Sequence, residues 1–157
     1  MAPTNSAEHG SDTPDLPALD FSTLKVGDQL PPLQFGNVTR HTLALYCGGS
    51  GDHNPIHVDR DFAQAAGYED VFAHGMLSMA ILGRMLTNWT KQENIKSFAV
   101  RFAAITQVLD EVTASATISD KTIEDGEQRL TLEIQTQTQT GTKTLTGSAI
   151  IVLPPSA

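Results

Sequence analysis

The sequence predicts an α+β domain in which a run of antiparallel strands packs against one long helix. Three observations lead to this prediction. Apolar residues recur at helical spacing from Gly75 to Trp89, an alternation with a period of two dominates the chain after residue 95, and a glycine-rich charged loop precedes the helix. A sheet that wraps around such a helix buries the apolar surface of both.

The 157 residues suit one domain with a sizeable core. Residues 1–19 are rich in Pro, Ser, Thr and Asp and contain few large apolar groups, so we expect a flexible tail there. The folded domain is expected to span residues 20–155. Its first segment, LKVGDQLPPLQF, is interpreted as a short strand or loop with breaks at Gly27 and at Pro31–Pro32.

Helices are expected on both sides of the charged loop. The first is predicted from Thr39 to Cys47, with Thr39 as its N-cap and the glycines after residue 47 as its end. One or two helical turns are predicted from Asp61 to Ala66. The long segment from Gly75 to Trp89 is apolar on almost all sides, which predicts a helix buried all round.

The chain after residue 95 has the pattern of strands. Residues 97–106 are apolar, and apolar residues alternate with polar ones in the segments 112–118, 130–138 and 145–153. Hairpin turns are predicted at Asp125–Gly126 and at Thr140–Gly141. This pattern is typical of antiparallel strands with one buried face.

The charge and cysteine content narrow the classes of function. Ten basic and 18 acidic residues give a net charge of −8, which argues against binding to nucleic acid or to an anionic membrane surface. The single cysteine, Cys47, cannot form an internal disulfide, which fits a reducing compartment. No apolar run reaches the roughly 18 residues of a spanning helix, and no secretory signal is recognisable at the start. We therefore expect a cytoplasmic protein.

The charged loop carries a candidate acid/base pair. Asp52 and His57 are five residues apart, and Asn54–Pro55 lies between them. Because Pro55 disfavours a helix here, the two side chains are expected on a turn that can direct both toward one point. An imidazole titrates near neutral pH and a carboxylate can polarise water, so the pair is suited to general acid/base catalysis.

His74 and Gly75 stand at the expected start of the long helix. The first N–H groups of a helix have no internal acceptor and lie at the positive end of the helix dipole. Gly75 lacks a Cβ atom, so a ligand carbonyl can approach its N–H closely. This is the geometry of an oxyanion site.

Other interpretations of the same residues remain open. Asp52 can be an ordinary turn residue, His57 a structural histidine, and Gly75 a helix-start glycine. Four side chains of metal-ligating type lie in this region: His53, His57, Asp59 and His74. The chain nevertheless has no HExxH or paired-cysteine spacing. GGSGD resembles a nucleophile elbow only in part, because Asp52 occupies its last position, and Cys47 lies at an apolar helix end.

The sequence SGDHNPIHVD, followed by AHGM, resembles the hydratase motif of the MaoC-like family. This family comprises (R)-specific enoyl-CoA hydratases and 3-hydroxyacyl thioester dehydratases. The resemblance runs from about Phe21 to Leu153 and includes VGDQLP near the start and VRF in the first long strand. It implies a hot-dog fold, in which an antiparallel sheet wraps around a long central helix. It also implies reversible syn addition of water to a trans-2-enoyl thioester.

The resemblance assigns roles to individual residues. Asp52 and His57 match the catalytic pair of the family, and Gly75 matches the N–H donor that polarises the thioester carbonyl. His74, which precedes this donor, and Asn54, which matches the motif asparagine that holds the loop, are expected with Gly75 to form the oxyanion and substrate-binding site. The implied substrate is an acyl-CoA or acyl-carrier-protein thioester, and no metal or redox cofactor is expected because the thioester already activates the alkene.

The resemblance also bears on partners. The family commonly forms dimers by joining two sheets, so we expect a homodimer, or a heterodimer with a related hot-dog subunit. Some members carry a serine further along the central helix, where this chain has Gly83. In this respect the chain is similar to the catalytic subunit of two-subunit dehydratases. A hot-dog thioesterase and a noncatalytic subunit are the alternatives. Four cations are candidates for contacts with coenzyme A phosphates: Arg84, Lys91, Lys96 and Arg101.

Overall fold

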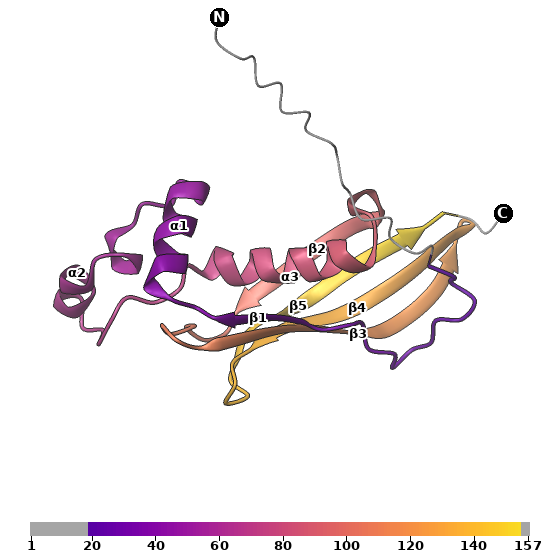
Figure 1. Ribbon diagram of the computed structural model, residues 1–157. Coiled ribbons are helices and arrows are strands. Elements are labelled where there is room, and N and C mark those ends of the chain that lie inside the picture. Colours follow the sequence, from indigo (N-terminus) through magenta and orange to yellow (C-terminus); the bar gives the residue numbers. More distant parts are fainter. Residues whose placement is uncertain (1–18, 155–157) are drawn as a thin grey trace, which may run out of the picture.

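The computed structural model describes residues 19–154 and contains one antiparallel sheet with a long helix along one face (Figure 1). Its five strands lie in the order β1-β3-β4-β5-β2. The strands are β1 (Leu33–Asn37), β2 (Ile95–Phe102), β3 (Glu111–Glu124), β4 (Glu127–Gln137) and β5 (Lys143–Leu153). The helices are α1 (Arg40–Ser50), α2 (Arg60–Ala65) and α3 (Gly75–Trp89), with short 3₁₀ turns η1 (Pro55–His57) and η2 (Gln92–Asn94). The predicted α+β architecture is confirmed.

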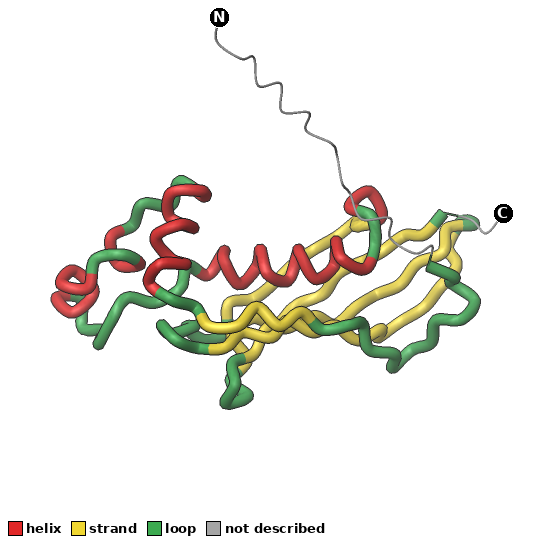
Figure 2. The backbone as a smooth tube through the Cα atoms, viewed as in Figure 1, coloured by secondary structure: helices red, strands yellow, loops and turns green. Residues whose placement is uncertain are grey.

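The long helix α3 has the bounds that its apolar pattern predicts, but only one of its sides is buried. Leu77, Ile81, Leu82, Met85 and Leu86 are buried, and α3 packs on β1, β3, β4 and β5. The opposite side is open, and the side chain of Met76 is 52% exposed. The prediction of a helix buried all round is therefore wrong, because a single sheet covers a single side of it (Figure 2).

The strands alternate between buried and exposed residues as predicted. In β3, Val112, Ala114, Ala116 and Ile118 face the core. The β3–β4 turn consists of Asp125 and Gly126, which both have positive φ angles, 51° and 84°. This conformation matches the twist of a two-residue hairpin. A second turn, with Gly141 at φ 84°, joins β4 to β5. Both predicted hairpins are confirmed.

The strand β2 pairs with β5 and runs back along α3 toward its first turn. Gly147 lies opposite Val100 in this pairing. A Cβ atom at Gly147 would collide with the backbone carbonyl oxygen of Ala99. The close approach of β2 therefore requires a residue without a side chain at position 147.

The segment between β1 and α3 forms a separate layer beyond the N-terminal end of α3 (Figure 1). Thr39 caps α1 by accepting a hydrogen bond from Thr42 N–H at 3.0 Å, as predicted. The helix continues through Gly48 and Gly49, however, and ends at Gly51, which has a φ angle of 76°. The expected end after residue 47 is wrong, because two glycines destabilise a helix by only about 0.5–1 kcal/mol each and do not break it.

The predicted tail falls largely on residues 1–18, which lie outside the described part of the chain. Leu19, the last residue of that predicted tail, is partly buried against the core. At the other end, the sheet ends with Leu153. Over residues 19–154, each helix falls short of the length and apolar character that crossing a membrane requires.

Candidate active site

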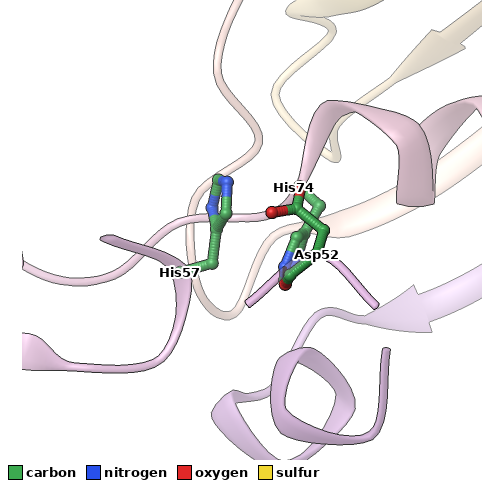
Figure 3. A group of neighbouring side chains, drawn as sticks. All are labelled: Asp52, His57 and His74. Atoms are coloured by element: carbon green, nitrogen blue, oxygen red, sulfur yellow. Dashed lines mark hydrogen bonds between the residues drawn. The ribbon is translucent and has the colours of Figure 1, made fainter. Parts of the chain in front are cut away.

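The structure brings Asp52, His57 and His74 together in front of the first turn of α3 (Figure 3). One side-chain oxygen or nitrogen of each residue lies within 4.8 Å of those of the other two. Asp52 is exposed, His57 is partly buried and His74 is buried. The turn proposed from Asn54–Pro55 is thus present, and it directs Asp52 and His57 toward the same point.

Two local hydrogen bonds from backbone N–H groups to side chains hold the loop that carries the pair. The Oδ1 atom of Asp52 accepts a hydrogen bond from Asn54 N–H at 3.3 Å. The side chain of Asn54 in turn accepts from Ile56 N–H at 3.2 Å and caps the 3₁₀ turn that presents His57. Asn54 does not line the neighbouring cavity. Its contacts are those of a residue that shapes the loop.

The backbone of Phe72 fixes the imidazole of His57. Nδ1 of His57 lies 2.8 Å from the carbonyl oxygen of Phe72. A carbonyl oxygen only accepts, so Nδ1 carries the proton and the neutral ring keeps its lone pair on Nε2. His57 is therefore held in the tautomer that can take a proton through Nε2.

A salt bridge holds the Phe72 segment against α1. Arg40, the first residue of α1, binds the carboxylate of Asp70 through both Nε and Nη2. The hydrogen bond from Arg40 lowers the pKa of Asp70, and Asp70 raises the pKa of Arg40. Asp70 also accepts from Val71 N–H at 2.8 Å. The bridge thus joins the helix that leads into Asp52 to the segment that orients His57.

His74 is buried behind the pair and does not line the cavity. Its side chain is 1% exposed, and Nε2 lies 3.1 Å from the carbonyl oxygen of Asp52, to which it donates. The ring lies 3.9 Å from that of His57 and 5.0 Å from that of Tyr46, measured between centroids. Burial is the main cause that lowers the pKa of His74, which keeps the ring neutral near pH 7. We interpret His74 as a residue that positions Asp52 and His57.

Gly75 is the first residue of α3 and faces a cavity of about 380 Å³. A Cβ atom at this position would lie 2.7 Å from Cε1 of Phe102, so the ring of Phe102 packs against the bare backbone of Gly75. The cavity has a mixed lining: His57, Phe72, Ala73, Gly75, Ser78, Phe102, Ala103, Ala104, Ile105, Thr106, Thr144 and Leu145. His57 and Gly75 therefore face the same space, and Asp52 adjoins it through His57.

Most of the residues that line the cavity were not predicted from the sequence, and Ser78 and Thr106 are two of them. Ser78 and Thr106 are buried hydroxyl residues in its lining. Gly83, the helix position compared with the family serine, instead lines a different hollow with Thr87, Gln92, Ile95 and Phe98. Ser78 was not predicted as a cavity residue, because a single serine in a long apolar helix can equally be a buried core residue.

The four candidate cations do not form one cluster. Lys91 and Lys96 lie at the far end of α3 from Gly75, about 20 Å away for a helix of 15 residues. Lys91 lies 4.0 Å from Glu93, and Lys96 donates to the carbonyl of Glu93. Arg84 is exposed on α3. Arg101 is exposed and directly precedes Phe102 in the chain, so of the four it is the one next in sequence to a cavity-lining residue.

The side chains of metal-ligating type are only partly available to an ion. Nδ1 of His57 and Nε2 of His74 both donate to backbone carbonyl groups, so each neutral ring has one nitrogen left as a ligand. His53 is exposed and Asp59 caps α2 by accepting from Phe62 N–H. Cys47 is buried, with Sγ 3.6 Å from Nδ1 of His53.

The MaoC like domain model matches residues 26–141. The chain belongs to this family. Two relatives are an (R)-specific enoyl-CoA hydratase from Rhodospirillum rubrum, 32% identical over 90 residues, and the fatty acid synthase subunit beta from Saccharomyces cerevisiae, 28% identical over 155 residues. The first match covers 52% of this chain and 58% of the hydratase, and the second covers 94% of this chain and 7% of the synthase subunit. The MaoC-like chain thus spans less than two thirds of either relative.

Two solved structures have the same fold as this chain. An (R)-hydratase from A. caviae involved in PHA biosynthesis is 27% identical, with a TM-score of 0.71 over 84% of this chain and 98% of that chain. A chain of the ChsH1–ChsH2 complex from Mycobacterium tuberculosis is 24% identical, with a TM-score of 0.70 over 83% of this chain and 98% of that chain. The hot-dog fold implied by the motif is confirmed, and this MaoC-like chain has hydratases and dehydratases as relatives.

Proposed function

We propose that this chain catalyses the reversible syn hydration of trans-2-enoyl thioesters to (R)-3-hydroxyacyl thioesters. The observation that carries the proposal is the convergence of Asp52 and His57 beside a cavity that also receives the first residue of α3. An acid/base pair next to a helix N-terminus suits a reaction that moves protons while negative charge develops on a carbonyl oxygen. Membership of the MaoC-like family supports the same reaction.

In the hydration direction, one water molecule lies between the Asp52 carboxylate and Nε2 of His57. The pair removes a proton as the water oxygen bonds to C3, and the electrons of the C2–C3 double bond move toward the thioester carbonyl. The pair then delivers one proton to C2 on the same face. Asp52 and His57 share these transfers, so we assign no separate base and acid.

The N–H of Gly75 stabilises the oxygen of the enolate intermediate. As the first residue of α3, Gly75 has an N–H group without an acceptor inside the helix, at the positive end of the dipole. Such a donor contributes roughly 10²–10³-fold to rate in other oxyanion sites. The thioester itself activates the alkene, so the reaction requires no metal or redox cofactor. Dialysis against a chelator is expected to leave the rate unchanged.

The carrier of the acyl group extends from the cavity toward solvent. Its phosphates need a local cation on a protein with a net charge of −8. Arg101 is our first candidate because it is next in sequence to Phe102, which lines the cavity, and Arg84, Lys91 and Lys96 are the other candidates. An Arg101→Glu variant is expected to raise the Michaelis constant for a CoA thioester more than Lys91→Glu does.

The active form is a dimer, either of two copies or with a related hot-dog subunit. The strands β1 and β2 are the edges of the sheet, and edge strands offer unpaired backbone groups to a partner. Met76 and Phe102, which are 52% and 54% exposed, form apolar surface at the same end of the molecule as the cavity. Light scattering that gives the mass of a single chain would contradict this proposal.

The test is the loss of enoyl absorbance when the purified chain acts on crotonyl-CoA and on a longer trans-2-enoyl-CoA. Hydration by the wild type, abolished in Asp52→Asn, supports the proposal. Release of free thiol without loss of the double bond indicates a thioesterase instead. If the folded chain hydrates neither substrate, the hypothesis that it is an active hydratase on its own is wrong. Co-purification is then the experiment that identifies an obligate partner.

A further inference from the structure

The buried part of the cavity lining carries two hydroxyl groups that are only weakly bonded to each other. Ser78 lies on α3, one turn after Gly75, and Thr106 lies in the segment after β2. Their side chains are 3% and 4% exposed. The Oγ atom of Ser78 lies 3.4 Å from Oγ1 of Thr106. This distance is longer than the roughly 2.7–2.8 Å typical of bonds between hydroxyls, so the contact is weak.

Neither hydroxyl has a second hydrogen-bonding partner among the described residues. A third cavity residue, Thr144, differs in this respect, because its Oγ1 lies 2.7 Å from Oγ1 of Thr136. Each hydroxyl can donate one bond and accept two. Ser78 and Thr106 together therefore offer a donor and several acceptor sites to whatever enters the cavity.

The part of the substrate that reaches these hydroxyls is the acyl group. The phosphates of coenzyme A, or the protein part of an acyl carrier, must remain in solvent. Among the residues that line the cavity, Ser78, Ala73 and Leu145 are buried, whereas Phe102 and Ile105 are exposed. The carrier therefore leaves past the exposed residues Phe102 and Ile105, and the acyl chain extends toward the buried residues Ser78 and Thr106.

We propose that Ser78 and Thr106 recognise an oxygen atom of the acyl chain. The preferred substrates are then trans-2-enoyl thioesters that carry a hydroxyl or carbonyl oxygen a few bonds beyond the double bond. Ser78 follows Gly75 by three residues, about 4.5 Å along the helix axis, which places this oxygen close to the reacting carbons. This inference rests on the proposed function, which puts the thioester carbonyl at Gly75.

A purely hydrocarbon chain is disfavoured by the same two residues. It would displace solvent from two buried hydroxyls without replacing the lost hydrogen bonds, which is an unfavourable exchange. The rest of the lining is largely apolar, so chain atoms next to the oxygen remain compatible with it. Ser78 and Thr106 therefore determine which acyl group is accepted. The catalytic roles remain with Asp52, His57 and Gly75.

The experiment compares trans-2-hexenoyl-CoA with its 5-hydroxy derivative as substrates of the full chain. The wild type is expected to use the 5-hydroxy compound with at least a roughly tenfold higher kcat/KM. Ser78→Ala and Thr106→Val are each expected to reduce this ratio severalfold. Thr138→Val is the matched control, because Thr138 is also buried but bonds to Thr140 outside the cavity. The control is expected to keep the ratio of the wild type.

A binding measurement separates this inference from the proposed reaction. Hexanoyl-CoA and 5-hydroxyhexanoyl-CoA have no double bond to hydrate, and their Kd values by calorimetry need no turnover. Tighter binding of the hydroxylated compound, weakened in both variants, supports the inference even if hydration is not found. Equal binding of the two compounds, or equal loss in the Thr138→Val control, overturns it. Failure to hydrate crotonyl-CoA overturns only the proposed function.

Discussion

Nδ1 of His57 donates to the carbonyl oxygen of Phe72 across 2.8 Å, and this contact determines what the histidine can do. It assigns the proton to Nδ1 and leaves Nε2 as the basic nitrogen of the neutral ring. Phe72 belongs to the segment that Arg40 holds through Asp70, so the tautomer of His57 depends on contacts well outside the loop.

Replacing either member of the pair is expected to remove most of the activity without unfolding the chain. Asp52→Asn and His57→Gln should each lower kcat by about 10²–10⁴-fold, because general acid/base groups contribute this much. The rate of crotonyl-CoA hydration measures the effect, and circular dichroism checks the fold. His53→Gln, an exposed histidine of the same loop, is the control and should keep the wild-type rate. Near-normal rates in both Asp52 and His57 variants would remove them from the mechanism.

Gly75→Ala is expected to lower the rate by about tenfold or more while the protein stays folded. The new Cβ atom would displace the ring of Phe102, which is a half-exposed side chain and can move. The displaced ring or the methyl group would then hinder access of the thioester carbonyl to the N–H group. Gly83→Ala is the matched control on the same helix, because its Cβ atom would meet Phe98 at an ordinary 3.5 Å. Equal rates for the two alanine variants would contradict the role of Gly75.

The stability of the protein is expected to fall as the pH drops below about 6.5, the usual pKa of histidine. Burial holds the pKa of His74 below this value in the folded chain. In this range the unfolded chain binds more protons than the folded chain, so the free energy of unfolding rises with pH and is lost on acidification. Thermal unfolding at pH 7 and pH 5 measures the effect.

The variant His74→Gln should reduce this dependence on pH, although it also removes a packed ring. His41→Gln provides the control, because His41 is exposed on α1 and should leave the dependence as it is. If His74→Gln unfolds with the same pH dependence as the wild type, His74 is not the group responsible.

Gly147→Ala is expected to destabilise the fold by about 1–3 kcal/mol, as overpacking does elsewhere. The collision involves the backbone carbonyl of Ala99, which cannot move without displacing β2. Gly48→Ala lies inside α1 with no neighbour to hit, and should stabilise the helix by about 0.5–1 kcal/mol. Chemical denaturation of the two variants should therefore shift the unfolding midpoint in opposite directions.

Periodic features of the chain were predictable from the sequence, because local spacing determines them. The bounds of α3, the cap at Thr39 and the turn at Asp125–Gly126 follow from the pattern of apolar residues and from turn chemistry. The end of α1 did not follow, since Gly48 and Gly49 are unfavourable in a helix but compatible with one. The exposed side of α3 was not predicted, because the apolar residues of a helix do not indicate whether a second layer covers its other side.

The site could be predicted in part for the same reason. The motif residues Asp52 and His57 are close in sequence and lie on one turn, so their convergence was predictable. The carbonyl of Phe72 and the hydroxyl of Thr106 reach the site only through tertiary contacts. The sequence pattern also gives no information on which backbone carbonyl accepts a hydrogen bond from a given side chain. The acceptor that orients His57 could therefore be found only in the structure.

The most direct test of the proposed reaction is hydration of crotonyl-CoA in D₂O, with the product analysed by NMR. The proposed mechanism predicts an (R)-3-hydroxyacyl thioester with one deuterium at C2, added to the same face as the hydroxyl at C3. Addition to opposite faces would contradict a shared Asp52–His57 pair, and release of free coenzyme A with the double bond intact would contradict hydration itself.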